Sequence, residues 1–119
     1  MNLNQFTVKA QEAVVDAQSL AVKKSHQSVD PEHLLFALLN QDDGLVPQVL
    51  GKIANHAPKA LLQEVQTAVD KKPEVHGNVQ TYTSSQLNKI LAKSEDESKK
   101  LRDDFVSTKH LFLLPFQIF

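Results

Sequence analysis

Apolar residues recur at spacings of three and four positions in several separate segments of the chain. The first segment spans about residues 5–24, and its apolar positions are Phe6, Ala10, Ala13, Val14, Ala17, Leu20 and Ala21. This spacing predicts a helix with one apolar face. Because most of these side chains are small, we expect another helix to approach that face closely.

Three further helices are predicted before residue 73. Asp30 and Pro31 favour a helix start, since Asp caps N-termini and Pro fits the first helical position. This helix is apolar on most sides, which predicts burial, and residues 40–44 end it. A short helix is predicted over residues 45–53, and another from Pro58 to about residue 72.

The segment 73–81 contains a proline, a glycine and no helical periodicity, which predicts a linker. One of the residues 83–85 is expected to cap a fifth helix, and Ser107 a sixth. The sixth helix should stop near Leu114, because Pro115 lacks a backbone donor. No segment alternates convincingly over the length of a strand, so the predicted fold class is all-α.

The second part of the chain partly repeats the first. Residues 29–36 and 106–113 align at an offset of 77 positions, which places His33 on His110. The same offset carries the apolar face of the first helix onto that of the fifth. A unit of this length buries its apolar face poorly alone. We therefore predict two pseudo-symmetric helical repeats, with a binding site at the seam between them.

We expect one domain over residues 1–119. The first repeat spans about 1–72, the linker about 73–82 and a partial second repeat about 83–114, and an unmatched tail covers 115–119. The second repeat lacks counterparts of the third and fourth helices, so it is predicted to be incomplete. The end of the chain, from Leu111 to Phe119, is rich in apolar residues. We expect it to fold back onto the first repeat or to associate with other chains.

Composition excludes several classes of function. The 13 Lys and Arg residues against 14 Asp and Glu residues leave a net charge of −1, without the basic excess typical of proteins that bind nucleic acid or anionic membranes. The absence of cysteine fits a reducing, cytoplasmic location. The three glycines lack the spacing of a phosphate-binding loop. We therefore expect neither ATP hydrolysis nor a cofactor.

The titratable residues do not form a recognisable catalytic or metal-binding pattern. No two of the five histidines lie closer than seven positions, so no metal site is predicted. His33 and His110 are expected to have structural, hydrogen-bonded roles. The carboxylates at 42–43, 95–97 and 103–104 are sequence neighbours, as on solvated surfaces, and no catalytic residue is predicted.

Several segments together resemble a known family. Residues 6–21, Pro31–Leu39 and the weaker second copy Phe105–Leu111 are similar to the N-terminal domain of Clp ATPases. The turn Asn40–Gly44 and the linker Pro73–Gly77 are most similar to the ClpB branch, the disaggregase chaperones. The resemblance covers residues 1 to about 114. It implies a fold of two helical repeats that recognises unfolded or aggregated protein and passes it to an ATP-driven AAA+ ring.

The resemblance also implies a polypeptide-contacting region at the seam, around Thr7, Asp103 and position 109. Position 109 is usually acidic in the family but is Lys109 here, so we expect acidic or neutral clients to be favoured. Glu32 is the first-repeat counterpart of Lys109 and completes the candidate set. The alternatives are a helix cap for Thr7 and an ordinary surface charge for Asp103.

Three classes of function follow from the sequence. The favoured one is a substrate-engaging interaction module of a Clp-type chaperone, without its own ATPase motor. The second is a free-standing helical adaptor or regulator that binds a protein partner. The third, an enzyme or a nucleic-acid binder, is disfavoured by the charge and by the absence of motifs.

Overall fold

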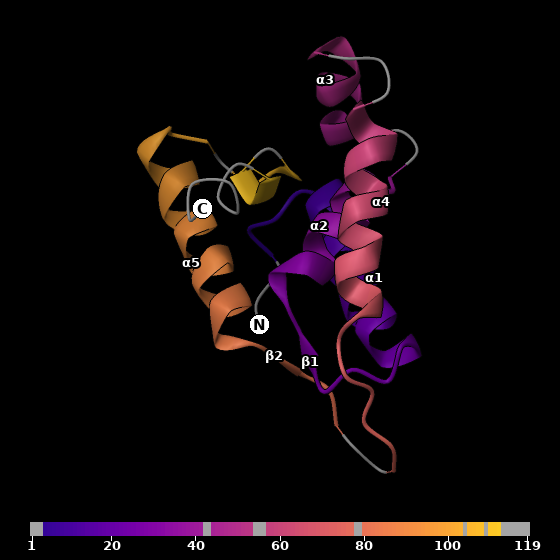
Figure 1. The fold of residues 1–119 in the computed structure, drawn as a ribbon. Helices are drawn as coiled ribbons and strands as arrows, with labels where there is room; N and C mark the ends of the chain where they lie inside the picture. The colour runs from indigo at the N-terminus through magenta and orange to yellow at the C-terminus, as the bar shows by residue number, and fades with distance from the viewer. Residues whose placement is uncertain are drawn as a thin grey trace.

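The computed structural model describes residues 4–41, 44–53, 57–77, 80–103, 105–108 and 110–112. Within these ranges the regular elements are helices and one pair of very short strands (Figure 1). The elements follow one another as α1 (Val8–Lys23), β1 (Ser28–Val29), α2 (Pro31–Leu39), α3 (Leu45–Ile53), α4 (Ala57–Asp70), β2 (Tyr82–Thr83) and α5 (Ser85–Lys100). The predicted all-α class is confirmed.

The helices follow from the apolar pattern and its caps. Ala10, Ala13, Ala17 and Ala21 of α1 are fully buried, and α1 packs closely against α2. α2 also contacts α4, which explains why it is apolar on most sides. A further helical turn begins after Ser107, whose carbonyl oxygen accepts from the N–H groups of His110 and Leu111. The predicted stop at Leu114 and the apolar tail lie outside the described residues.

The two repeats are joined by a reciprocal exchange of short segments. β1, in front of α2, pairs in parallel with β2, in front of α5. Phe6, in front of α1, forms a parallel bridge with Val106, in front of the last helical turn. The two connections are equivalent under the 77-residue offset, because Phe6 corresponds to Thr83 and Val106 corresponds to Val29. We call the pairing of residues 25–29 with residues 75–77 and 80–84 the first joint, and that of residues 5–7 with Val106 the second joint.

The hydrogen bonds of the two joints correspond. The Thr7 N–H donates to the carbonyl oxygen of Val106 at 2.9 Å, and the Ser84 N–H donates to that of Val29 at 3.0 Å. The helices that precede β1 and Val106 also end alike, with Ser25 at φ 59° and Arg102 at φ 58°. Such left-handed conformations are uncommon outside glycine. The repeats therefore share their backbone geometry as well as their apolar pattern.

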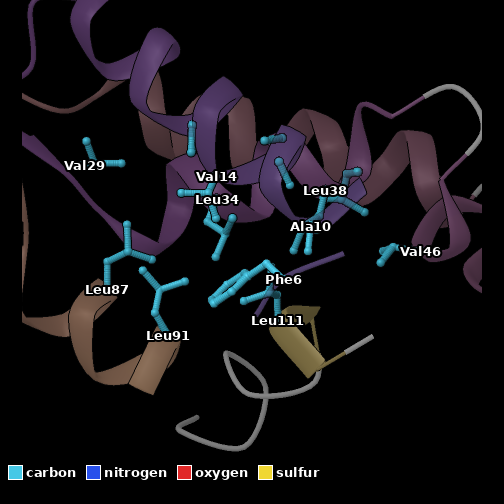
Figure 2. Packing of buried hydrophobic residues seen from close by; sticks show 14 of the residues in the cluster. Phe6, Ala10, Val14, Val29, Leu34, Leu38, Val46, Leu87, Leu91 and Leu111 are labelled. Atoms are coloured by element: carbon cyan, nitrogen blue, oxygen red, sulfur yellow. The ribbon is translucent and has the colours of Figure 1, made fainter. Parts of the chain in front are cut away.

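One core serves both repeats. Phe6 is 2% exposed and lies among Leu34 of α2, Leu91 of α5 and Leu111 (Figure 2). Figure 1 shows α5 standing apart from α1–α4, with β1 and β2 running between the two groups. Leu111 and the α5 face therefore close over Phe6 from the side opposite α2. This arrangement positions the seam, because the segment that carries Phe6 runs along it.

The caps of α1 and α5 provide a matched pair of substitutions. Thr7 Oγ1 accepts from the Ala10 N–H at 3.2 Å, and Ser84 Oγ accepts from the Leu87 N–H at 3.1 Å. We expect Thr7→Ala and Ser84→Ala each to lower the free energy of unfolding by about 1 kcal/mol. Chemical denaturation measures both. A loss at only one of the two positions would contradict the equivalence of the caps.

Candidate functional site

A pocket of about 300 Å³ lies at the second joint. One lining residue comes from the segment before α1, three come from the C-terminal half of α5, and two come from the segment after α5. They are Gln5, Glu95, Ser98, Lys99, Asp103 and Val106. Two large apolar residues beside Asp103 in the sequence, Leu101 and Phe105, are 58% and 52% exposed. The pocket thus combines two carboxylates and one ammonium group with apolar surface nearby.

The structure places the predicted site residues in different regions. Asp103 lines the pocket, and Thr7 lies next to it, because its N–H bonds the pocket residue Val106. Glu32 is in the first turn of α2, where its Oε2 lies 2.8 Å from Lys72 Nζ. Lys109 lies outside the described residues. Thr7 and Asp103 are therefore brought to the same joint, whereas Glu32 belongs to an ion-pair cluster of the first repeat.

Asp103 is held in place by a buried histidine. The side chain of His110 is 3% exposed, and its Nε2 lies 3.0 Å from Oδ2 of Asp103. His110 Nδ1 accepts from the Ser107 backbone N–H at 2.9 Å, so the ring proton is on Nε2 and is donated to Asp103. The carboxyl side chain, 37% exposed, keeps part of its surface toward solvent.

Ser107, His110 and Asp103 superficially resemble a catalytic triad, since Ser107 Oγ lies 3.1 Å from His110 Nδ1. A general base needs a free lone pair to take the serine proton. Here Nδ1 already accepts the backbone N–H of Ser107. In the first repeat Asp30 stands at the position of Ser107, and its N–H donates to His33 Nδ1 at 2.9 Å. The arrangement therefore stabilises a helix start in both repeats.

The first repeat replaces the carboxylate with a second histidine. Because His33 Nδ1 is occupied by the Asp30 N–H, its proton is on Nε2 and is donated to His26 Nδ1, at 2.8 Å. His26 is 5% exposed and His33 0%. Burial lowers the pKa of both imidazoles below the usual 6.5. The described residues contain no group of three potential metal ligands.

His26 is the residue that sequence reasoning missed. The signal was present, because the 77-residue offset maps Asp103 onto His26 and His110 onto His33. The hydrogen-bonded roles predicted for His33 and His110 fit the observed geometry, since each accepts a backbone N–H through Nδ1 and donates through Nε2.

Lys72 connects the end of α4 to the start of α2. Its Nζ lies 2.9 Å from Asp30 Oδ2 and 2.8 Å from Glu32 Oε2. Burial raises the pKa of Asp30, but the hydrogen bonds from Lys72 and Ser28 outweigh this and leave that pKa below its usual 3.8. Burial likewise lowers the pKa of Lys72, but its bonds to Glu32 and Asp30 leave that pKa above 10.5.

Lys72→Met should leave two partly buried carboxylates without their cation. We expect a loss of about 1–3 kcal/mol in the free energy of unfolding at pH 7, and less than about 0.5 kcal/mol for the exposed neighbour, Lys71→Met. Asp30 has a depressed pKa, so its contribution is present above pH 3.8 and is lost below it. The difference in the free energy of unfolding between wild type and Lys72→Met should therefore shrink below pH 3.8. Equal losses for the two variants at pH 7 would refute the assignment.

The described residues include no helix that is long and apolar enough to cross a membrane. The model of the family described as "Clp repeat (R) N-terminal domain" matches residues 5–116. The ClpB chaperone of Bacillus cereus is 43% identical over 117 residues, which are 95% of this chain and 13% of that protein. The ClpB chaperone of Nitratidesulfovibrio vulgaris is 38% identical over 116 residues, again 13% of its length.

Solved structures agree on the fold. The N-terminal domain of the ClpV1 ATPase from E. coli EAEC superposes with a TM-score of 0.81 at 24% identity, covering 92% of this chain and 66% of that one. The Hsp104 N-terminal domain from Candida albicans gives 0.76 at 22% identity, covering 92% and 72%. The chain spans about an eighth of the length of the ClpB relatives (13%). Taken with its reciprocal repeats and the match over residues 5–116, the chain belongs to the Clp repeat N-terminal domain family.

Proposed function

We propose that this domain is the substrate-engaging module of a ClpB-type chaperone and binds unfolded or aggregated polypeptide at the second joint. The observation that carries the proposal is the pocket at the seam, where Asp103 lies beside segments from both repeats. Family membership supports it, because the ClpB relatives are chaperones. An AAA+ ring in the parent protein, to which the bound chain is passed, and a cytoplasmic location are part of this proposal.

The chemistry of the pocket suits an extended polypeptide better than a small metabolite. Its charged groups come from Glu95, Lys99 and Asp103, which can meet backbone amides and side chains of either charge. Leu101 and Phe105 offer exposed apolar surface on either side of Asp103 in the sequence. Aromatic side chains such as that of Phe105 are enriched at protein-binding surfaces. Because the surface is small and open to solvent, binding is expected to be weak and readily reversible.

Similar proteins are consistent with a polypeptide ligand. A chain that superposes with a TM-score of 0.80 belongs to a solved structure described as a peptide from the EAEC T6SS Sci1 SciI protein. The identity there is 24%, so the likeness concerns the fold. The proposal of a polypeptide ligand for this chain therefore rests on its own seam pocket.

Asp103→Asn tests the charge of the site without removing its hydrogen bond. The asparagine oxygen can still accept from His110 Nε2, so the fold should persist, while the negative charge is lost. A permanently unfolded model polypeptide is titrated into isotope-labelled domain and followed by NMR. We expect shifts at Gln5, Ser98, Asp103 and Val106, and about two- to fivefold weaker binding by the variant, since one exposed charge contributes up to about 1 kcal/mol.

Asp96→Asn is the matched control, since Asp96 is exposed on the same helix, α5, and is not among the pocket residues. It should bind as wild type does. Thr7→Ala and Ser84→Ala remove equivalent caps, so a binding loss confined to Thr7→Ala would identify Thr7 as a contact. Absence of shifts around the pocket, or equal affinity of wild type and Asp103→Asn, would overturn the assignment.

A further inference from the structure

The His26–His33 pair forms a chain of hydrogen bonds that admits only one arrangement of protons. The backbone N–H of Asp30 is fixed as a donor, so His33 Nδ1 must accept. His33 must then carry its proton on Nε2, and His26 must accept it through Nδ1. An added proton at either Nδ1 atom places two donors face to face. Taking up one proton therefore breaks one of the two bonds.

In the second repeat the residue that corresponds to His26 is Asp103, so the hydrogen-bond chain there does not contain a second imidazole. There the acceptor for His110 Nε2 is the Asp103 carboxylate, at 3.0 Å. This bond joins an imidazole to a carboxylate, where the first repeat joins one imidazole to another. In the first repeat the corresponding partner, His26, offers no negative charge. The two joints are thus alike in backbone, but the histidine network beside the first contains two linked imidazoles and that beside the second an imidazole and a carboxylate.

The segment that carries His26 supplies the carbonyl oxygens of the first joint. The Ser25 oxygen accepts from the Val75 N–H at 2.8 Å, and the Gln27 oxygen accepts from the Tyr82 N–H at 3.1 Å. The His26 oxygen itself accepts from the Thr81 hydroxyl at 3.0 Å. Movement of His26 away from His33 therefore disturbs the attachment of residues 75–77 and 80–84 to the first repeat.

We propose that the His26–His33 pair is a pH-sensitive latch, whose protonation loosens the first joint while the second joint stays closed. The inference is independent of the proposed function, because it concerns the attachment of the linker and not the pocket at Asp103. It assigns to His26 a regulatory role that neither its sequence position nor its burial alone would indicate.

Charged groups around the pair act in both directions. Lys72, after α4, and Lys24, at the end of α1, oppose a positive imidazole, whereas Glu74, Asp30 and Glu32 favour it. Burial is the largest influence on both residues, and it lowers both pKa values below 6.5. The closed joint thus binds fewer protons than the open one. Its stability is complete above pH 6.5 and falls as the pH drops below that value.

Amide hydrogen exchange of the wild-type chain at pH 7.5 and pH 5.5 tests the latch. Protection factors correct for the intrinsic effect of pH on exchange. We expect those of Val75, Tyr82 and Ser84 to fall at pH 5.5, by roughly tenfold for each histidine that gains its proton only on opening. The Thr7 and Val106 amides of the second joint are the internal control and should change less than about threefold.

His26→Asp supplies the matched variant, because it gives the first repeat the acceptor that the second repeat already uses. Its first joint should lose the selective fall in protection between pH 7.5 and pH 5.5. Equal changes at the two joints of the wild-type chain would overturn the proposal. An undiminished fall in His26→Asp would overturn it as well. If that variant does not fold, the comparison of the two joints in the wild type decides alone.

Discussion

The reciprocal backbone pairing across the seam is the constraint on which the rest of this structure depends. The segment before each repeat's first helix hydrogen-bonds to the segment before the other repeat's second helix, at Thr7 with Val106 and at Ser84 with Val29. A unit of this size cannot bury its apolar face alone. The exchange therefore fixes where the two faces meet and where Phe6 enters the common core.

The two histidine networks show how the same backbone solution is supported by different chemistry. His33 and His110 each accept a backbone N–H through Nδ1 in the first turn of a helix. Through the N–H at Nε2 each donates to a side chain seven positions earlier in the sequence. In the second repeat that residue is Asp103, which also faces the pocket. In the first repeat it is His26, which is buried. One position thus lines a candidate binding site in one repeat and forms a buried contact between two histidines in the other.

Much of the fold follows from local signals in the sequence. The helix periodicity, the Asp30–Pro31 start and the caps in front of α1 and α5 depend on neighbouring residues, and these predictions match the described elements. The two-residue strands could not be predicted, because a pair so short has no alternation and is set by the partner segment. The pocket depends on residues as distant as Gln5 and Asp103. Asp103 entered the candidate set only through a family resemblance.

The central claim is that two equivalent backbone connections hold the repeats together. Scalar couplings through hydrogen bonds, measured by NMR on the isotope-labelled chain, report each connection directly. The account predicts a coupling from the Thr7 amide nitrogen to the Val106 carbonyl carbon, and a matching one from Ser84 to Val29, because both bonds are short, at 2.9 Å and 3.0 Å. Detection of one coupling without the other, or couplings to different partners, would contradict it.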